Sequence, residues 1–320
     1  MDLWGLIIMR KNKIIYSLST RGLYSELFNL CLAMVYARQK NLHIELNTYL
    51  WNSRFKSGWI DYFESTIESS NNSFSAQDKV YTNEKPWIGK VYYKPKEFFT
   101  FYYRSFLNQI YKIVHPRHLL TKDIFKEMRS SDFIYNALGD NAFNLMESSF
   151  KQIYILNPKT KNLIKQRIRE LEIPDDYIGV HIRRGDKITS KEMNYIHNQK
   201  YVKAIVDHKM LSNNIYIATD DTGVINSLKT ELESLGFIVY YNLQNDSKGF
   251  DEAVFNQTAK QHRYKETINV LLDMEILTHS KFFIGTYTSN LSRVVPFYLG
   301  IDHCISLDNE WNIINSINGL

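Results

Sequence analysis

The segment IPDDYIGVHIRRGDK, residues 173–187, brings several reactive groups together, because an apolar strand pattern runs directly into two arginines, an aspartate and a lysine. Arginine stays charged at any working pH, and its planar fork suits a bidentate grip on a phosphate. Side chains alternate along a strand, so we expect Arg183 to contact a ligand and Arg184 to turn the other way, to a structural acid. The alternative is that both arginines form structural salt bridges, with Asp186 as one partner.

Asp220 and Asp221, in ATDD at residues 218–221, end another predicted strand. Paired carboxylates could hold a divalent metal ion that bridges a diphosphate. Asp221 also stands directly before the helical pattern TGVINSLKTELESLG, where an aspartate caps a helix N-terminus. The pattern favours the cap over the metal site.

A glycine- and hydroxyl-rich turn, GTYTSNLSR, opens a further predicted helix. Its hydroxyl groups and free amides could cradle a phosphate, and plain helix caps are the alternative. Beside the arginine strand end, a second anion-binding element predicts a diphosphate ligand. The candidate binding residues of this turn are Thr286, Thr288, Ser289, Asn290 and Arg293.

Asp273 stands among apolar positions of the helical pattern RYKETINVLLDMEILTHS. An acid in that setting is either a core residue satisfied by a hydrogen bond or a reader of a ligand's donor edge, such as that of guanine. The pattern alone favours neither interpretation.

The elements that must position these groups alternate between strands and helices. This alternation predicts a parallel, doubly wound α/β sheet. Ligands bind such sheets beyond the carboxyl ends of the strands, so the three strand-end groups should open onto one edge. Strands are expected at residues 177–184, 213–221, 236–242, 281–289 and 303–307, and helices at 199–211, 222–235, 264–279 and 289–298.

The first half of the chain begins with a predicted strand, turn, helix and strand, in which LHIEL is the second strand. Gly22, at the turn before the helix, either presents free amides to a phosphate or makes a plain tight turn. Residues 50–110 are irregular in pattern and aromatic, and we expect them to face the acceptor. Further helices are expected at 118–130, at 140–152 and from a cap at Asn157 to near Pro174, where the domain boundary should fall.

Length and composition bound the class of protein. The 320 residues predict two domains, and the net charge of +5 favours anionic partners without a basic block of the kind that binds nucleic acid. Cys31 and Cys304 lack metal-ligand spacing and indicate buried free thiols in a reducing, cytoplasmic compartment. The apolar run at residues 3–9 is too short to span a membrane and predicts a first strand rather than a signal peptide, which leaves at most peripheral contact with the inner face of a membrane.

Three motifs in order, HIRRGDK, IYIATDD and RYKETINVLLDMEILTHSKFFIGTYTSNLSRVV, resemble the GDP-fucose-dependent fucosyltransferases of the core alpha-1,6 type. The alpha-1,2 and protein O-fucosyltransferases share the first motif. The resemblance covers about residues 174–298 and implies a GT-B fold of two facing Rossmann-like domains with parallel sheets. Residues 1–173 would form the acceptor-side domain, and residues 174–320 the domain that binds the GDP-sugar.

The resemblance also implies roles in donor binding. Arg183 would hold the β-phosphate with support from Ser289, while His181 and Asp273 would read the guanine. The N-terminal donor loop of the family is usually richer in glycine than STRGLYSEL, which keeps only Gly22. The further donor-binding residues would be Gly22, Asp186, Asp221, Thr288, Asn290 and Arg293.

The reacting centre would lie near Lys187. Counted back from Tyr201, Glu192 matches the family's acidic residue after this lysine, with one extra residue inserted between them. Glu192 is therefore the candidate general base that takes the acceptor's proton. Arg183, Lys187 and Glu192 are the expected catalytic residues. The resemblance also implies that neither a metal nor a cofactor is needed, and an arginine with helix amides is suited to stabilise the departing GDP instead.

The implied activity is an inverting transfer of fucose from GDP-fucose to a hydroxyl of a glycan, with an N-acetylglucosamine unit as a candidate acceptor. The chain resembles the compact bacterial, nodulation-type members, which favours a glycolipid, polysaccharide or oligosaccharide acceptor over a protein N-glycan. Two alternatives stay open. One keeps the fold with another GDP-sugar donor, and the other is a GDP- or carbohydrate-binding protein without catalysis.

Overall fold

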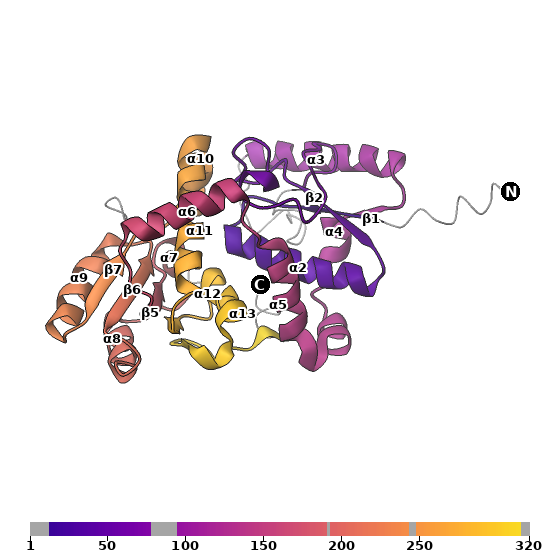
Figure 1. Cartoon of the computed structure of the whole chain (residues 1–320). Coiled ribbons are helices and arrows are strands. Elements are labelled where there is room, and N and C mark those ends of the chain that lie inside the picture. The colour runs from indigo at the N-terminus through magenta and orange to yellow at the C-terminus, as the bar shows by residue number, and fades with distance from the viewer. Residues whose placement is uncertain (1–12, 78–94, 191–192, 243–247, 315–320) are drawn as a thin grey trace. The chain divides into compact units, whose positions relative to one another are not determined.

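The computed structural model describes residues 13–77, 95–190, 193–242 and 248–314, and it divides into two compact units between Ile155 and Leu156 (Figure 1). Helix α6 (Pro158–Glu170) falls in the second unit, where Arg167 donates hydrogen bonds to the side chains of Asn269 at 2.7 Å and Asn242 at 2.9 Å. The functional boundary at 173/174 stays a prediction. The strand predicted from the apolar run at 3–9 lies outside the described residues.

The first unit contains a parallel sheet in the order β3-β2-β1-β4. LHIEL is a strand, as predicted, and helix α2 is buried on most of its sides because its sequence is apolar all round. The strands are β1 (Lys13–Ser17), β2 (His43–Asn47), β3 (Ser69–Ser70) and β4 (His118–Leu120), and the α-helices are α2 (Leu23–Gln39), α3 (Pro95–Val114), α4 (Thr121–Phe125) and α5 (Ala142–Ile153). Short 3-10 turns span Trp59–Asp61 and Gly139–Asn141, and a π-helix spans Phe133–Leu138.

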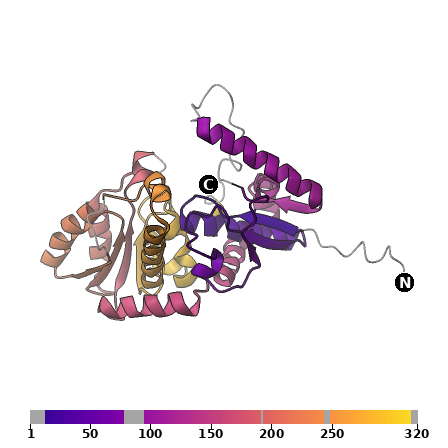
Figure 2. The same cartoon turned by 90° about the horizontal axis from the view of Figure 1, so that it is seen from above.

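Two expectations for the first unit are wrong. Residues 95–110, part of the segment 50–110 that was predicted to be irregular, belong to the long helix α3 (Figure 2, purple). The helix predicted at 118–130 begins instead as a strand, because β4 pairs in parallel with β1, with Lys13 opposite His118 and Ile15 opposite Leu120. Only then does the chain turn into α4.

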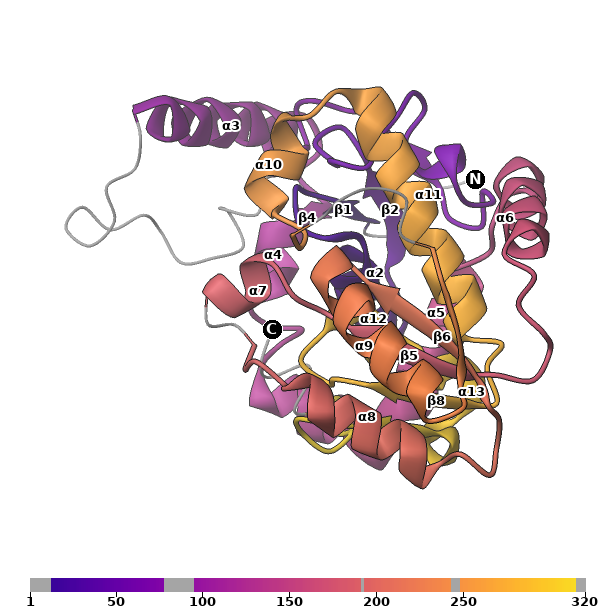
Figure 3. The ribbon, with the colours of Figure 1, turned by 90° about the vertical axis from the view of Figure 1, so that its left-hand side faces the viewer.

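The second unit is a five-stranded parallel sheet in the order β7-β6-β5-β8-β9, flanked by helices such as α8, α9 and α11 (Figure 3). The strands are β5 (Ile178–Ile182), β6 (Asn214–Thr219), β7 (Ile238–Tyr241), β8 (Phe282–Gly285) and β9 (Cys304–Ser306). Counted within the unit, this order is 3-2-1-4-5, the doubly wound arrangement that the alternating pattern predicts. The strand order reverses between β5 and β8, so the carboxyl ends of these two strands mark the expected ligand site.

The helices of the second unit agree with prediction in most places. Two short helices, α7 and α10, were not predicted, and the segment predicted at 289–298 divides into α12 and α13 around Val295. After α6 the helices are α7 (Asp186–Thr189), α8 (Asn198–Asp207), α9 (Thr222–Ser234), α10 (Glu252–Gln257), α11 (Lys260–Leu277), α12 (Asn290–Val294) and α13 (Pro296–Leu299), and a 3-10 turn spans Ile301–His303.

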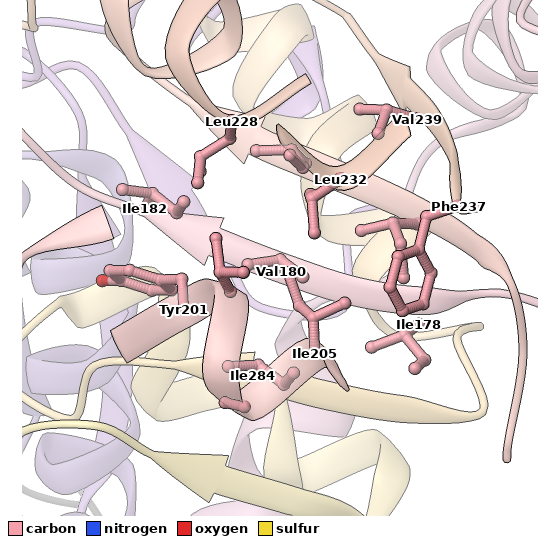
Figure 4. Packing of buried hydrophobic residues seen from close by; sticks show 14 of the residues in the cluster. Ile178, Val180, Ile182, Tyr201, Ile205, Leu228, Leu232, Phe237, Val239 and Ile284 are labelled. Carbon is pink, nitrogen blue, oxygen red and sulfur yellow. The ribbon is translucent and has the colours of Figure 1, made fainter. Parts of the chain in front are cut away.

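The core of the second unit fixes which side chains of β5 face the site. Ile178, Val180 and Ile182 point to one face of the sheet, where they belong to a fully buried cluster with Ile205 of α8 and Leu228 of α9 (Figure 4). Because side chains alternate along a strand, the residues between them point to the opposite face. His181 therefore lies on the face away from this cluster.

Both cysteines are buried free thiols, as predicted. In the part of the chain that the structure describes, none of the helices combines the length and the apolar character needed to cross a bilayer.

Candidate functional site

Arg183 leaves the carboxyl end of β5 and is held between two carboxylates. Its Nη1 donates to Asp220 Oδ2 and its Nη2 donates to Asp186 Oδ1, each at 2.7 Å. The three side chains are between 15% and 25% exposed, so the cluster is partly sheltered but open to a ligand. A guanidinium has five N–H donors, and these two bonds use one on each terminal nitrogen. The second N–H of each nitrogen can bind an anion.

Asp220 and Asp186 also bind the loop before α10. Asp220 accepts hydrogen bonds from the backbone amides of Arg184 and Phe250, both at 2.8 Å, and Asp186 accepts one from the amide of Glu252 at 2.9 Å. The Arg183 guanidinium lies over the Phe250 ring, 5.0 Å from its centroid. The two aspartates therefore fix both the direction of Arg183 and the loop beneath it.

Gly185 and Gly249 are the point at which this loop meets the arginine motif. Both have left-handed backbone angles, with φ of +66° and +97°. A Cβ on Gly249 would lie 2.4 Å from the Cα of Gly185, and a Cβ on Gly185 would lie 2.4 Å from the carbonyl oxygen of Phe250. Only glycine at both positions permits this approach of backbone to backbone.

Arg184 turns away from Arg183, but the acid expected as its partner is replaced by neutral groups. Its Nη2 donates to the Ile196 carbonyl at 2.9 Å and to Asn198 Oδ1 at 2.8 Å, and its guanidinium lies 4.4 Å from the centroid of the Tyr195 ring. Arg184 is buried. Its role is to hold the chain after α7 against the sheet.

His181 is buried and neutral. Its Nδ1 lies 2.7 Å from Ser292 Oγ, in the helix that follows β8. Burial, reinforced by the positive charge of Arg183, lowers the pKa of the imidazole to about 3. A neutral ring keeps one nitrogen as a donor and one as an acceptor, which suits the reading of a base.

Asp273, on α11, borders the same face of the sheet as His181. Its Oδ1 accepts a hydrogen bond from the hydroxyl of Tyr216 at 2.6 Å, and Tyr216 points to the His181 face because it stands opposite Gly179 while His181 stands opposite Ala218. Burial raises the pKa of the Asp273 carboxyl to about 7, in spite of the opposing hydrogen bond from Tyr216. Tyr216 was not identified from the sequence.

The turn after β8 holds an internal anion, Asp308. The amides of Tyr287 and Thr288 donate to its carboxylate at 2.6 and 3.1 Å, and the hydroxyl of Thr288 donates to it at 2.5 Å. Ser289 donates its amide to the carbonyl of Thr286 at 3.1 Å. The amides of Tyr287, Thr288 and Ser289 are therefore paired within the protein, the first two with an acid about twenty residues further along the chain. The role of this turn as a phosphate cradle stays a prediction.

Among the other polar residues of this turn, Arg293 braces it from within. Arg293 donates through Nε to the Tyr287 carbonyl at 2.8 Å and through Nη1 to Asn290 Oδ1 at 3.1 Å. Ser289 stands at the cap position of α12 without a capping hydrogen bond from its own side chain. The hydroxyl oxygen of Thr286 is buried without a hydrogen-bond partner.

Asp221 caps α9, as the sequence predicts, and its Oδ1 accepts from the Gly223 amide at 2.8 Å. Asp220, weighed as the other metal ligand, instead binds Arg183 and two backbone amides. Over residues 13–77, 95–190, 193–242 and 248–314, we find no group of three or more His, Cys, Asp or Glu side chains placed to hold a metal ion.

Three further predicted residues stand apart from this cluster. Lys187 lies in α7, next to Asp186, and is partly buried. Glu192 lies outside the described residues, so its role stays a prediction. Gly22, in the first unit, stands at the cap of α2, and a Cβ there would meet no atom within 4 Å.

A family model for the N-terminal and catalytic domains of alpha-(1,6)-fucosyltransferase matches residues 142–298, which include every element of the Arg183 cluster. Over this region, which is just under half of the chain, the sequence is similar to the alpha-1,6-fucosyltransferases. An alpha-(1,6)-fucosyltransferase of Drosophila melanogaster is 24% identical over 154 residues, which are 44% of this chain but only 23% of the relative. The match thus spans about a quarter of that relative's length.

Solved structures of fucosyltransferases share the fold. The alpha-1,6-fucosyltransferase NodZ soaked with GDP-fucose aligns over 94% of this chain and 97% of its own, with a TM-score of 0.55 and 14% identity. POFUT1 in complex with GDP-fucose aligns over 94% of this chain and 96% of its own, with a TM-score of 0.52 and 9% identity. This agreement confirms the predicted GT-B class of α/β fold with parallel sheets.

Proposed function

We propose that this protein is a fucosyltransferase that moves fucose from GDP-fucose to a hydroxyl of a glycan, in an alpha-1,6-type reaction with inversion. The observation that carries the proposal is the placement of Arg183. Its guanidinium is fixed by two carboxylates at the carboxyl end of β5, where the strand order reverses, within the region that matches the alpha-1,6 family. That position is where doubly wound sheets bind nucleotides.

The reaction is a single displacement. The acceptor oxygen attacks the anomeric carbon of fucose on the face opposite GDP, the bond from that carbon to the phosphate oxygen breaks, and GDP departs with the bonding electrons. Arg183 and its fixed N–H groups stabilise the negative charge that develops on the leaving β-phosphate. The acceptor's proton passes to a carboxylate, for which Glu192 is our candidate, and Lys187 lies near the reacting centre.

Recognition of the nucleotide falls to the face of the sheet on which His181 lies. The neutral His181 and the carboxylate of Asp273 border one face of the sheet, where they would read the donor edge of guanine. Asp186, Asp220 and Asp221 would order the surrounding loops. We propose that the enzyme needs no metal ion, that its acceptor is a glycolipid, polysaccharide or oligosaccharide, and that it works in the cytoplasm.

Release of GDP from GDP-fucose, measured with a panel of glycans ending in N-acetylglucosamine and with or without EDTA, tests the proposal. We expect acceptor-dependent release that EDTA leaves unchanged. Arg183→Ala should lower kcat by about a hundredfold to a thousandfold, since one preorganised donor to a developing anion contributes about 3–4 kcal/mol. Arg169→Ala, which changes an exposed arginine of α6, is the matched control and should keep full activity.

Three results would contradict or change the proposed function. An absence of turnover with every glycan, together with an absence of GDP binding by calorimetry, would refute the proposed function. GDP binding that persists without turnover would favour a nucleotide-binding protein, and faster turnover of another GDP-sugar would reassign the donor.

A further inference from the structure

Helix α3 of the first unit exposes an apolar face. Tyr102, Phe106 and Ile113 are 54%, 58% and 79% exposed, and their spacing of four and seven residues places them on one side of the helix. Tyr103 and Val114, at 59% and 66%, widen the same side. At about 1.5 Å per residue, this face extends about 18 Å along the helix axis.

The buried side of α3 is separate and already has its partners. Leu107, Asn108 and Tyr111 are buried, and Asn108 donates hydrogen bonds to the carbonyls of Phe74 and Ala76. The exposed apolar side chains are therefore not needed to attach α3 to its own unit. Single exposed apolar residues are common on proteins, but five in thirteen positions on one side of a helix indicate a binding surface.

The charge of the chain segment around this face favours an anionic partner. No acidic residue occurs between Glu97 and Asp123, whereas Arg104, Lys112, Arg117 and Lys122 do. Lys112 pairs with Asp123 at 2.6 Å, so residues 98–123 carry a net charge of +3 (four basic minus one acidic).

We infer that the exposed face of α3, formed by Tyr102, Tyr103, Phe106, Ile113 and Val114, docks on the surface of an anionic phospholipid bilayer. Aromatic and aliphatic side chains beside basic residues are typical of helices that lie in the interface of a membrane. Anionic lipid attracts each nearby Lys or Arg by about 1 kcal/mol. A second copy of the chain is the less favourable partner, because a twofold contact would bring two positively charged α3 segments together.

Binding of the full chain to vesicles tests the inference without any reference to fucose transfer. We expect co-sedimentation with vesicles of phosphatidylcholine and phosphatidylglycerol, weaker binding to phosphatidylcholine alone, and further weakening at high salt. Tyr102→Ser combined with Phe106→Ser should lower the partition coefficient tenfold or more. Ile238→Ser combined with Val254→Ser removes two similarly exposed apolar side chains from the second unit and should leave binding unchanged.

A labelled variant keeps the test valid if the double substitution disturbs folding. Cys31 and Cys304 are buried, so Phe106→Cys offers a thiol that an environment-sensitive dye should modify selectively. The dye's emission should shift to the blue on addition of anionic vesicles. An unshifted emission would overturn the inference, and so would vesicle binding that the α3 substitutions leave unchanged. A dimer that those substitutions dissociate, or binding of the same face to soluble glycan instead of lipid, would also overturn it.

Discussion

Binding of GDP-fucose should strengthen about tenfold between about pH 6 and about pH 8, and Asp273 should be the group responsible. The structure gives the reason. Burial raises the pKa of the Asp273 carboxyl to about 7, so that at neutral pH about half of the free protein carries it protonated. Only the carboxylate can accept both donors of a guanine edge, so the nucleotide must displace that proton before it binds fully.

The magnitude follows from the pKa. With a carboxyl of pKa about 7 that must be ionised in the complex, the apparent Kd rises by a factor of about 11 at pH 6 and about 1.1 at pH 8, a difference of about 1.4 kcal/mol. His181 cannot account for this change, because burial holds the pKa of its imidazole near 3 and the ring stays neutral throughout the range. GDP-fucose is the right probe, because its diphosphate does not titrate between pH 6 and pH 8, whereas the terminal phosphate of free GDP does.

Calorimetry in two buffers of different ionisation heat would measure both the affinity and the number of protons released. Asp273→Asn should bind weakly and lose the pH dependence. Tyr216→Phe removes a hydrogen bond that lowers the pKa of Asp273, so the transition should move to higher pH with the same amplitude. If wild-type affinity is constant across the range while Asp273→Asn binds as tightly as the wild type, then Asp273 belongs to the core and not to the guanine site.

Two further substitutions test the loops around Arg183. Gly249→Ala should lower turnover at least tenfold, because the added Cβ would push the loop away from Gly185. Gly236→Ala is the control. Its φ is also positive, at +85°, but the added Cβ would meet only the end of Lys209 at 3.5 Å, so this variant should lose about 1 kcal/mol of stability and keep its turnover. Equal activity of the two variants would contradict the role of the contact. Asp308→Asn should reduce the free energy of unfolding in urea by about 1–3 kcal/mol, since hydrogen bonds to Thr288 and its neighbours are lost. An unchanged unfolding midpoint would show that the turn is stable without Asp308.

The sequence predicted the second unit well because its pattern is strong. Five strands alternate with helices, and each strand is buried or flanked by turn residues, so the sheet and its carboxyl edge followed from the alternation alone. The helix cap at Asp221 could also be predicted from the sequence, because a cap is a local interaction. Burial of Asp273 beside Tyr216 is compatible with both interpretations that the pattern allowed, and the pH dependence of binding separates them.

The parts that sequence reasoning missed depend on contacts between distant residues or on a weak period. Asp220 binds Phe250 thirty residues away and Asp308 binds the turn at Thr288, and no local pattern signals either pair. Strand β4 has three residues, too few to show alternation. Helix α3 was taken for irregular chain because its first half is rich in Phe and Tyr, which are weaker helix formers than Ala or Leu.

The charges around Arg183 explain how such a site could grip a diphosphate and still release it. Arg183 contributes one positive charge, and Asp186 and Asp220 contribute two negative ones, so the cluster carries no surplus of positive charge. Attraction to the donor must then come from N–H groups held in fixed directions and not from a surplus of positive charge. Fixed donors stabilise charge that develops at one position in the transition state, whereas a surplus of charge would bind substrate and released GDP alike. The two aspartates that bind Arg183 therefore make its direction useful, because they hold its remaining N–H groups in place.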